Sequence, residues 1–380
     1  MQPGHALPDL SDTRIAFADR SDAALRRAYW LFRVIGSPLL TRTGTALTRM
    51  ALALHLPVKG LIKATIFKQF VGGEHIAETL GTAARLAGRG VGTILDFSVE
   101  GQDDDASLDA TAAEVLRTIA VAKEHAHVPF AVFKPTGVAR MAIMERVSNG
   151  TPLDPADQAE WDRAKGRVLR LCQAAHDAGV PLLVDAEDSW VQQAIDDLVA
   201  DMMRRFNRER PIVFNTAQLY RHDRLAFLRE SIAAARRDGH HYGVKLVRGA
   251  YMEKERERAG EQGYRDPIQP DKAATDRDFD EALRLCVANV EHVAVMAGTH
   301  NEASTLLLAR LMADQGLARD DKRVWSAQLL GMSDNISFNM AAAGYNVVKY
   351  VPYGPVRKVM PYLFRRAEEN TSARGQTGRE

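Results

Sequence analysis

The chain has 380 residues, 46% of them hydrophobic and 26% charged, so it can form a large core and has the composition of a folded globular protein rather than a disordered one. Its 50 Lys and Arg residues nearly balance its 49 Asp and Glu residues, which argues against a generic nucleic-acid binder. It has two cysteines, Cys172 and Cys286, and no CxxC pattern, which excludes a disulfide framework or a structural zinc site and indicates a reducing compartment.

Residues 1–90 are predicted to form a helical arm. The first residues lack the basic-then-apolar order of a secretory signal, and no run of 18 apolar residues occurs, so we expect a cytoplasmic protein. From Ala23 to Gly73 there is no acidic residue, whereas eight basic residues fall there: Arg26, Arg27, Arg33, Arg42, Arg49, Lys59, Lys63 and Lys68. This positive face packs against the rest of the protein or makes a peripheral contact with anionic lipid at the inner face of the membrane.

After Gly90 short β-rich runs alternate with long amphipathic runs. The predicted strands are Thr93–Val99, Phe130–Lys134, Pro181–Asp185, Ile212–Ala217, Tyr242–Val247, His292–Ala297, Arg323–Ala327 and Asn346–Val351. The predicted helices between them include Ala106–His125, Asp157–Ala178, Val191–Arg208, Leu225–Asp238, Asp278–Val290 and Glu302–Met312. Eight such units indicate a (βα)8 barrel over residues 91–370, followed by a flexible tail over 371–380.

An open doubly wound sheet is the alternative architecture. Its usual signal, GxGxxG between the first strand and its helix, is missing, and Gly88, Gly90 and Gly92 precede the first strand instead. The chain also has no GxxxxGK[ST] phosphate loop. The closed barrel is therefore favoured.

In such barrels the chemistry gathers at the carboxyl ends of the strands. The polar residues that end or follow the predicted strands are Glu100, Lys134, Asp185, Gln218, Arg248, Tyr251, Thr299, His300, Asn301, Gln328 and Tyr350. A charge at the end of a buried strand must be paired, so Lys134 and Asp185 predict an ion pair at the barrel top. Lys245 lies inside the fifth strand and could face the same opening.

Metal catalysis and Schiff-base chemistry are the two other chemistries to compare with these residues. Metal catalysis is not expected, because HExxH is absent and the pairs His125/His127 and His240/His241 precede strands rather than follow them. A Schiff-base aldolase stays open, since Lys134 or Lys245 could react with a carbonyl substrate.

The last helix carries two adjacent arginines, Arg365 and Arg366. Neighbouring residues on a helix point about 100° apart, so both can face one ligand only if the helix lies across the top of the pocket. Two guanidinium groups there would clamp a carboxylate. The alternative is a solvated basic pair, but nearby Tyr350 and Tyr362 favour an enclosed site with aromatic walls.

Several strings of this sequence resemble the proline dehydrogenase (proline oxidase) family. They are LLVDAE (182–187), NTAQLY (215–220), GVKLVRGAY (243–251), GTHN (298–301), QLLGMSDNISF (328–338) and KYVPYGPVRKVMPYLFRRAEENTS (349–372). The resemblance runs in chain order from about Phe67 to Asn370, and it is closer to the mitochondrial and monofunctional enzymes than to the bifunctional proline-utilisation enzyme.

The resemblance implies a distorted barrel that binds FAD and oxidises L-proline to Δ1-pyrroline-5-carboxylate by hydride transfer to flavin N5, with a membrane quinone as electron acceptor. It assigns Arg365 and Arg366 to the proline carboxylate. It assigns Lys134, Tyr350 and Tyr362 to the substrate pocket, with Asp185 and Lys245 as catalytic residues.

The same resemblance places a set of residues at flavin-contact positions: Ala186, Gln218, Lys245, Arg248, Gly249, Ala250, Thr299 and His300. Lys245 stands where the bifunctional enzymes carry an arginine beside N5, so the charge there is preserved. Glu100 resembles the acidic residue that pairs with the first arginine of the final helix when the site closes, which would make it a gate.

Two further alternatives accompany the resemblance. Hydroxyproline dehydrogenase is the nearer one, but the bulky Tyr350 leaves little room for a ring hydroxyl and favours unmodified proline. The other is a barrel without cofactor that docks a membrane or a partner.

Overall fold

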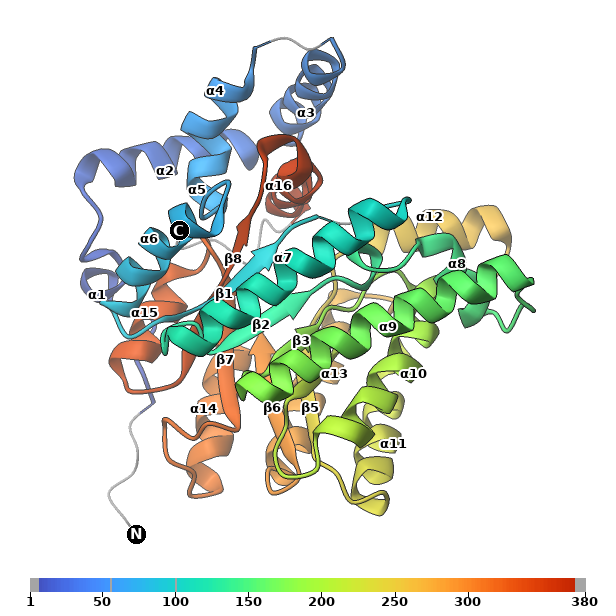
Figure 1. Cartoon of the computed structure of the whole chain (residues 1–380). Helices are drawn as coiled ribbons and strands as arrows, with labels where there is room; N and C mark the ends of the chain where they lie inside the picture. The colour runs from blue at the N-terminus through green and yellow to red at the C-terminus, as the bar shows by residue number, and fades with distance from the viewer. Residues whose placement is uncertain (1–6, 55–56, 100, 373–380) are drawn as a thin grey trace.

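The eight predicted strands form a closed barrel (Figure 1). The computed structural model describes residues 7–54, 57–99 and 101–372. Each strand pairs in parallel with the next along the chain, and β8 pairs with β1 to close the cylinder. The strands are β1 (Gly92–Phe97), β2 (Phe130–Phe133), β3 (Leu182–Val184), β4 (Val213–Gln218), β5 (Tyr242–Val247), β6 (Val293–Gly298), β7 (Val324–Leu329) and β8 (Val347–Tyr353). The predicted (βα)8 fold is confirmed.

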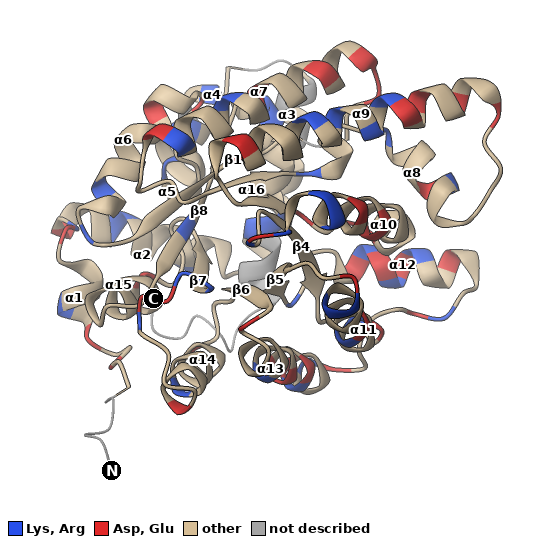
Figure 2. Ribbon diagram, turned by 60° about the horizontal axis from the view of Figure 1, so that its bottom comes forward, with Lys and Arg blue, Asp and Glu red and all other residues tan. Residues whose placement is uncertain are grey.

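Helices surround the barrel (Figures 1 and 2). They are α7 (Asp105–Glu124), α8 (Met141–Ser148), α9 (Pro155–Ala178), α10 (Ser189–Phe206), α11 (Arg224–Arg237), α12 (Met252–Gln262), α13 (Lys272–Ala288), α14 (Glu302–Asp314), α15 (Asp334–Ala342) and α16 (Val356–Ser372), with a 3₁₀ turn at Pro135–Gly137. The helix predicted from Asp278 begins earlier, at Lys272, because the Asp271 carboxylate accepts the backbone N–H of Ala274 and caps it.

The residues before the barrel are helical. They form α1 (Thr13–Phe17), α2 (Asp22–Ile35), α3 (Pro38–Ala53), α4 (Lys59–Ile62), a π-helical turn (Lys63–Phe67), α5 (Lys68–Phe70) and α6 (Ile76–Ala87). Figure 1 shows α2, α3 and α4 gathered around α16, apart from the barrel helices, and both α2 and α3 contact α16. The division into arm, barrel and tail stays an interpretation, and residues 373–380 of the expected tail lie outside the described residues.

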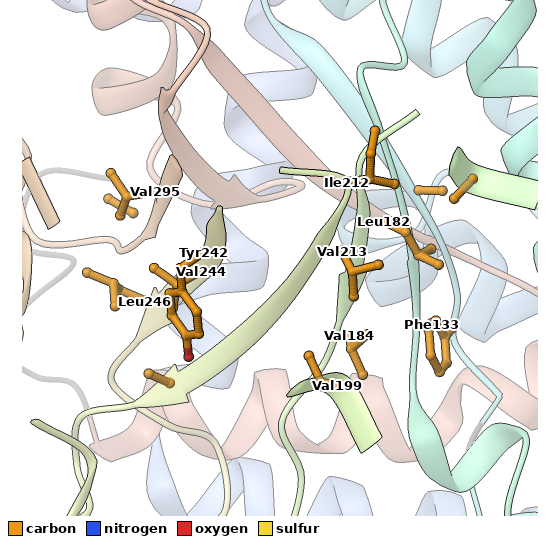
Figure 3. Packing of buried hydrophobic residues seen from close by; sticks show 14 of the residues in the cluster. Phe133, Leu182, Val184, Val199, Ile212, Val213, Tyr242, Val244, Leu246 and Val295 are labelled. Atoms are coloured by element: carbon orange, nitrogen blue, oxygen red, sulfur yellow. The ribbon is translucent and has the colours of Figure 1, made fainter. Parts of the chain in front are cut away.

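Both faces of the barrel strands are buried. Along β2, Phe130 and Val132 belong to the cluster inside the barrel, whereas Ala131 and Phe133 belong to the cluster between strands and helices. This is the two-residue alternation of a strand, and it explains why parallel barrel strands appear in the sequence as unbroken apolar runs. Figure 3 shows part of the outer cluster, with labelled side chains from β2 to β6 and Val199 from α10. The interior cluster forms a dry floor beneath the carboxyl ends of the strands.

A buried charge network fastens the turn after β7. Lys349, fully buried in β8, places its Nζ 2.9 Å from Asp334 Oδ1 and donates to the backbone carbonyls of Leu329 and Met332. Arg20, which precedes α2, lies 2.8 Å from the other Asp334 oxygen. Burial raises the pKa of Asp334, but the charges of Lys349 and Arg20 outweigh it and hold that pKa below its usual value. The network therefore ties the barrel, the turn and the N-terminal segment together.

Lys349→Met should lower the free energy of unfolding by about 3 kcal/mol, because Asp334 loses one of its two cations while two carbonyl groups lose their donor. Urea unfolding of the purified protein measures this. Lys322→Met is the matched control, since Lys322 is exposed, and its Nζ donates to Asn346 Oδ1 at 3.1 Å and lies 5.6 Å from the ring centre of Trp325. Its change should stay within about 0.5 kcal/mol. Equal effects of the two substitutions would contradict a structural role for the network.

Candidate active site

Polar side chains from four strands meet at the carboxyl end of the barrel. Lys134 follows β2, Asp185 follows β3, Lys245 lies in β5 and Tyr350 in β8. Lys134 Nζ lies 3.0 Å from Asp185 Oδ2, and the Tyr350 hydroxyl donates to the same oxygen at 2.6 Å. Lys245 Nζ forms an ion pair with the other oxygen, Asp185 Oδ1. The barrel thus assembles one cluster around a single carboxylate, which includes the ion pair expected between Lys134 and Asp185.

The surroundings fix the protonation of Asp185. Burial raises the pKa of Asp185. The charges of Lys245 and Lys134, together with hydrogen bonds from Lys245 and Tyr350, lower this pKa by more than burial raises it, so the net pKa lies well below the usual value. Asp185 is therefore an anion at neutral pH, with both oxygens engaged.

Tyr350 is held as a neutral phenol. Burial raises its pKa well above the ordinary value, and the nearby charges of Asp185 and Asp96 raise it further. The Nζ atoms of Lys134 and Lys245 lie 5.5 and 5.1 Å from the centre of its ring, within reach of cation–π attraction. The ring is consequently fixed beside two ammonium groups. Its hydroxyl stays protonated and donates a hydrogen bond to Asp185.

Asp96 belongs to the same cluster, and the sequence analysis missed it. It lies in β1, with its Oδ1 3.1 Å from Lys134 Nζ, and accepts a hydrogen bond from Ser98 Oγ through Oδ2. The available signal was a carboxylate inside the apolar run TILDF, two residues after Ile94, which faces the barrel interior. Period-two alternation therefore puts Asp96 on the inner face as well.

The two adjacent arginines of α16 reach the far side of the barrel mouth. Arg365 places its guanidinium 5.7 Å from the ring of Tyr251, which follows β5. Arg366 is buried, 5.1 Å from the ring of Tyr362, and its charge acts on His300, which follows β6. α16 starts directly after β8, and its two arginines act on residues that follow β5 and β6, so the helix extends from β8 towards β5 and β6.

Arg248, just after β5, is held by three partners. Its Nε donates to Asp276 Oδ1 at 2.7 Å, and its two terminal nitrogens donate to Thr299 Oγ1 at 2.7 Å and Ser304 Oγ at 3.0 Å. The guanidinium also lies 4.4 Å from the ring centre of Phe279. Asp276, on α13, carried no sequence signal, because its position on that helix emerges only from the packing. These contacts fix a cation at the mouth beside the end of β6.

His300, after β6, is a neutral imidazole. Its Nδ1 lies 2.8 Å from Ser333 Oγ, and Ser333 has a left-handed backbone with φ of 50°. Burial lowers the pKa of His300 to about 3, helped by the charges of Lys349, Arg366 and Arg248. His300 therefore offers hydrogen bonds and not charge at neutral pH.

Four more expected residues lie along the same edge. Gln218 ends β4 and donates through Nε2 to the backbone carbonyl of Glu187 at 2.7 Å. Gly249 has φ of 141°, and a Cβ there would overlap the ring of Tyr220, so this position requires glycine. Ala186 and Ala250 follow β3 and β5 directly.

The expected residues thus form two neighbouring groups. The expected substrate residues, with Asp185, gather around the ends of β2, β3 and β8 and on α16; the expected flavin contacts line the ends of β3 to β6, and Lys245 belongs to both groups. Glu100, the expected gate, lies outside the described residues. Chemically, the first group offers two arginines and an aromatic wall, and the second a lysine, a fixed arginine, a hydroxyl and a neutral imidazole.

The lowered pKa of His300 predicts a pH dependence of stability. Between pH 6.5 and about 3 the unfolded chain binds a proton at this residue that the folded chain does not, so the free energy of unfolding falls as pH decreases. Because the side chain is only partly exposed, we expect a contribution of up to about 2 kcal/mol between pH 7 and pH 4.5. His300→Gln should remove it.

Urea unfolding at the two pH values measures this contribution. The exposed His176 supplies the control, and His176→Gln should keep the wild-type difference between the two pH values. If His300→Gln loses as much stability on acidification as the wild type, the burial argument for His300 is wrong.

Comparison with protein families and curated proteins gives a consistent match. A family described as proline dehydrogenase matches residues 79–379. The chain is 38% identical to the carbapenem antibiotics biosynthesis protein CarD of Pectobacterium carotovorum subsp. carotovorum, over 83% of this chain and 81% of that protein. It is 44% identical to the human mitochondrial proline dehydrogenase 1, over 59% of this chain and 38% of that protein. It is 32% identical to mitochondrial proline dehydrogenase 1 of Arabidopsis thaliana, over 82% and 71%.

Solved structures match the fold. The crystal structure of proline utilization A from Bdellovibrio bacteriovorus, inactivated by N-propargylglycine, aligns with a TM-score of 0.74 at 18% identity. The alignment covers 92% of this chain and 37% of that one. A mutant of the protein of the same name from Bradyrhizobium japonicum aligns with a TM-score of 0.67 at 22% identity, over 82% of this chain and 31% of that one.

Proposed function

The chain belongs to the proline dehydrogenase family, where it resembles the monofunctional, mitochondrial-type enzymes, and on this premise we propose that it oxidises L-proline to Δ1-pyrroline-5-carboxylate, with FAD as cofactor and a membrane quinone as electron acceptor. One observation carries the proposal: α16 brings Arg365 and Arg366 over a barrel mouth that holds the cluster around Asp185. The cytoplasmic location expected from the sequence stays a prediction.

The arginines of α16 suit the carboxylate of proline. A guanidinium binds a carboxylate through charge-assisted hydrogen bonds of fixed geometry, and two of them fix its orientation. Tyr362 is buried beside Arg366, and Tyr350 lies below with its hydroxyl turned to Asp185. The carboxylate would thus be anchored at α16, while the apolar ring of proline packs on these aromatic side chains and water is excluded.

The residues on the other half of the mouth fit an anionic flavin dinucleotide. Lys245 and Arg248 supply two cations, Thr299 a hydroxyl, and Gln218 and His300 neutral polar groups, all at the ends of β4 to β6. Such a donor set suits phosphate and ring oxygen atoms. When bound, FAD supplies the acceptor for the hydride that leaves the ring carbon next to nitrogen. Gly249 and Ala250 add little side-chain bulk along this edge.

Within the cluster, Asp185 acts by position and not as a base. Both of its oxygens already accept hydrogen bonds, and its pKa lies below the usual value. It therefore holds the ammonium group of Lys245 in place, where a positive charge stabilises negative charge that develops next to it. Hydride leaves the ring from the neutral amine, so the substrate nitrogen must give up its proton before that step.

The same contacts weigh against an aldolase. A lysine forms a Schiff base only as a free amine, yet the Nζ atoms of both Lys134 and Lys245 are paired with Asp185. Hydroxyproline is the alternative substrate, and the size of Tyr350 favours proline over it.

Purified protein should show flavin absorption bands, and anaerobic L-proline should bleach them because two electrons leave the substrate. Rapid-mixing absorbance spectroscopy measures the rate. Pyrrolidine, which has the same ring without the carboxylate, is the matched control and should bleach poorly, since it cannot use the arginines. Hydroxyproline should bleach more slowly than proline. Bands left unchanged by millimolar proline would remove the proposed activity.

Arg365→Met and Arg366→Met should each raise the KM for proline by about 30-fold or more, because loss of a charge-assisted contact costs at least about 2 kcal/mol. Steady-state kinetics with an artificial electron acceptor measure the change. Arg357→Met is the control, since Arg357 is exposed on the same helix and should leave KM unchanged. A wild-type KM in either of the first two variants would show that the carboxylate binds elsewhere.

A further inference from the structure

Exposed apolar side chains are concentrated on the N-terminal helices. Of the ten exposed large hydrophobic residues among those described, eight lie between Tyr29 and Leu54. Five of these eight lie on α3 or, in the case of Leu54, directly after it: Leu39, Leu40, Leu47, Met50 and Leu54. The first four recur at helical spacing, so they share one face of α3. An apolar face of this kind on an otherwise well-packed protein marks a contact with a partner or a membrane.

The exposed side chains of α2 are not part of its core contact. Leu31, Phe32 and Ile35 belong to the cluster that packs α2 against α16. Tyr29 and Trp30 point the other way, with exposed fractions of 54% and 60%. Because α2 already buries one apolar face, the packing of α2 on the protein does not require the exposed side chains of Tyr29 and Trp30.

The charge on this surface is mainly positive. Arg26, Arg27 and Arg33 are exposed on α2, and the sequence from Ala23 to Gly73 contains no acidic residue. The outer barrel helices differ, since α9 and α12 carry Asp and Glu beside Lys and Arg along their length (Figure 2). Asp22, at the start of α2, is the exposed acidic residue of these two helices. A surface that is both apolar and mainly basic complements one that is apolar beneath and anionic above, as an anionic bilayer is.

Aromatic and basic groups on α2 are arranged as at a bilayer interface. The Arg33 guanidinium donates to the Tyr29 hydroxyl at 2.8 Å and lies 5.7 Å from the ring centre of Trp30. Tyr and Trp are favoured at the level of lipid headgroups, where one part of the ring is wet and the rest is apolar. In this arrangement the arginine would meet phosphate while the indole enters the acyl boundary.

We propose that α2 and α3 dock this protein on an anionic phospholipid bilayer, with both helices lying in the plane of the headgroups. The two helices have 14 and 16 residues, short of the roughly 20 that span a membrane. Among the described residues, no helix combines the length and apolar character that a bilayer crossing requires. The helices therefore lie on the bilayer and do not cross it.

This docking adds to the proposed function. The membrane binding is argued from the surface of α2 and α3, and only its role in electron transfer to quinone rests on the proposed function. A quinone resides in the bilayer, so an enzyme that reduces it must work at the membrane surface. The docking helices pack directly on α16, which carries Arg365 and Arg366 over the barrel mouth (Figure 1). Docking through α2 and α3 would thus hold the mouth next to the lipid.

Vesicle co-sedimentation of the full-length protein tests the proposal. Vesicles of phosphatidylcholine with phosphatidylglycerol should bind it at low salt and less at high salt, whereas pure phosphatidylcholine should bind it much more weakly. The triple variant Arg26→Gln/Arg27→Gln/Arg33→Gln should bind anionic vesicles about 100-fold less tightly, since each basic residue near such a surface contributes roughly five-fold. Arg236→Gln/Arg237→Gln, which neutralises an exposed pair at the end of α11, should bind as the wild type does.

A second set of variants tests the apolar part. Leu39→Ser/Leu47→Ser/Met50→Ser should lose binding to anionic vesicles, because three apolar side chains no longer enter the acyl boundary. Met252→Ser/Tyr264→Ser is the matched control, since it removes the other two exposed large hydrophobic side chains and should leave binding unchanged. Thermal unfolding confirms that each variant is folded.

Three results would overturn the proposal: no binding of the wild type to anionic vesicles, equal binding to neutral vesicles, or unchanged binding of both the arginine and the apolar variants. A dimer in light scattering that becomes a monomer in the apolar variant, without vesicle binding, would assign the face to a second copy of the chain. Proline-dependent bleaching in the same variants, measured without vesicles, reports on the proposed function alone. Bleaching without docking and docking without bleaching are therefore separate outcomes.

Discussion

Asp185 places a negative charge at the end of a buried strand, where only other side chains can compensate it. Lys134 and Tyr350 reach one of its oxygens and Lys245 reaches the other. Asp96 and Asp185 together balance Lys134 and Lys245, so losing either lysine would leave one buried negative charge of the cluster uncompensated, which costs several kcal/mol. The ends of β2, β3, β5 and β8 must therefore stay in register with one another. Barrel closure provides this register, because β1 pairs with β8 as well as with β2.

This polar layer rests on an apolar floor. Ile94, Phe130, Val132, Leu183 and Phe214 fill the interior directly beneath the strand ends. Because the floor excludes water, the charges above it interact strongly with one another, and each cation shifts the pKa of its neighbours. The low pKa of Asp185 and the high pKa of Tyr350 have this common origin. Fold and site are therefore one structure: the packing of the barrel sets the electrostatics of its mouth.

The sequence predicted the barrel because its strands are buried on both faces and so appear as short apolar runs between long helices. The same logic located Lys134, Asp185 and Tyr350, since a polar residue at the end of such a run has only the barrel mouth to occupy. Asp96 was missed because it lies within the run and not at its end, although alternation with Ile94 would have placed it inside. Asp276 could not be found this way, because its contact with Arg248 joins two elements through helix packing alone.

The sequence predicted a final helix across the top of the pocket only on the condition that Arg365 and Arg366 face one ligand. Adjacent Arg365 and Arg366 point about 100° apart on any helix, so only the docking of α16 decides whether they converge. That docking depends on α2 and α3, whose inner faces pack on α16, through residues such as Phe32 and Ile35. The N-terminal helices consequently do two things at once. Their inner side packs against the helix that carries the arginines, and their outer side presents the apolar and basic surface.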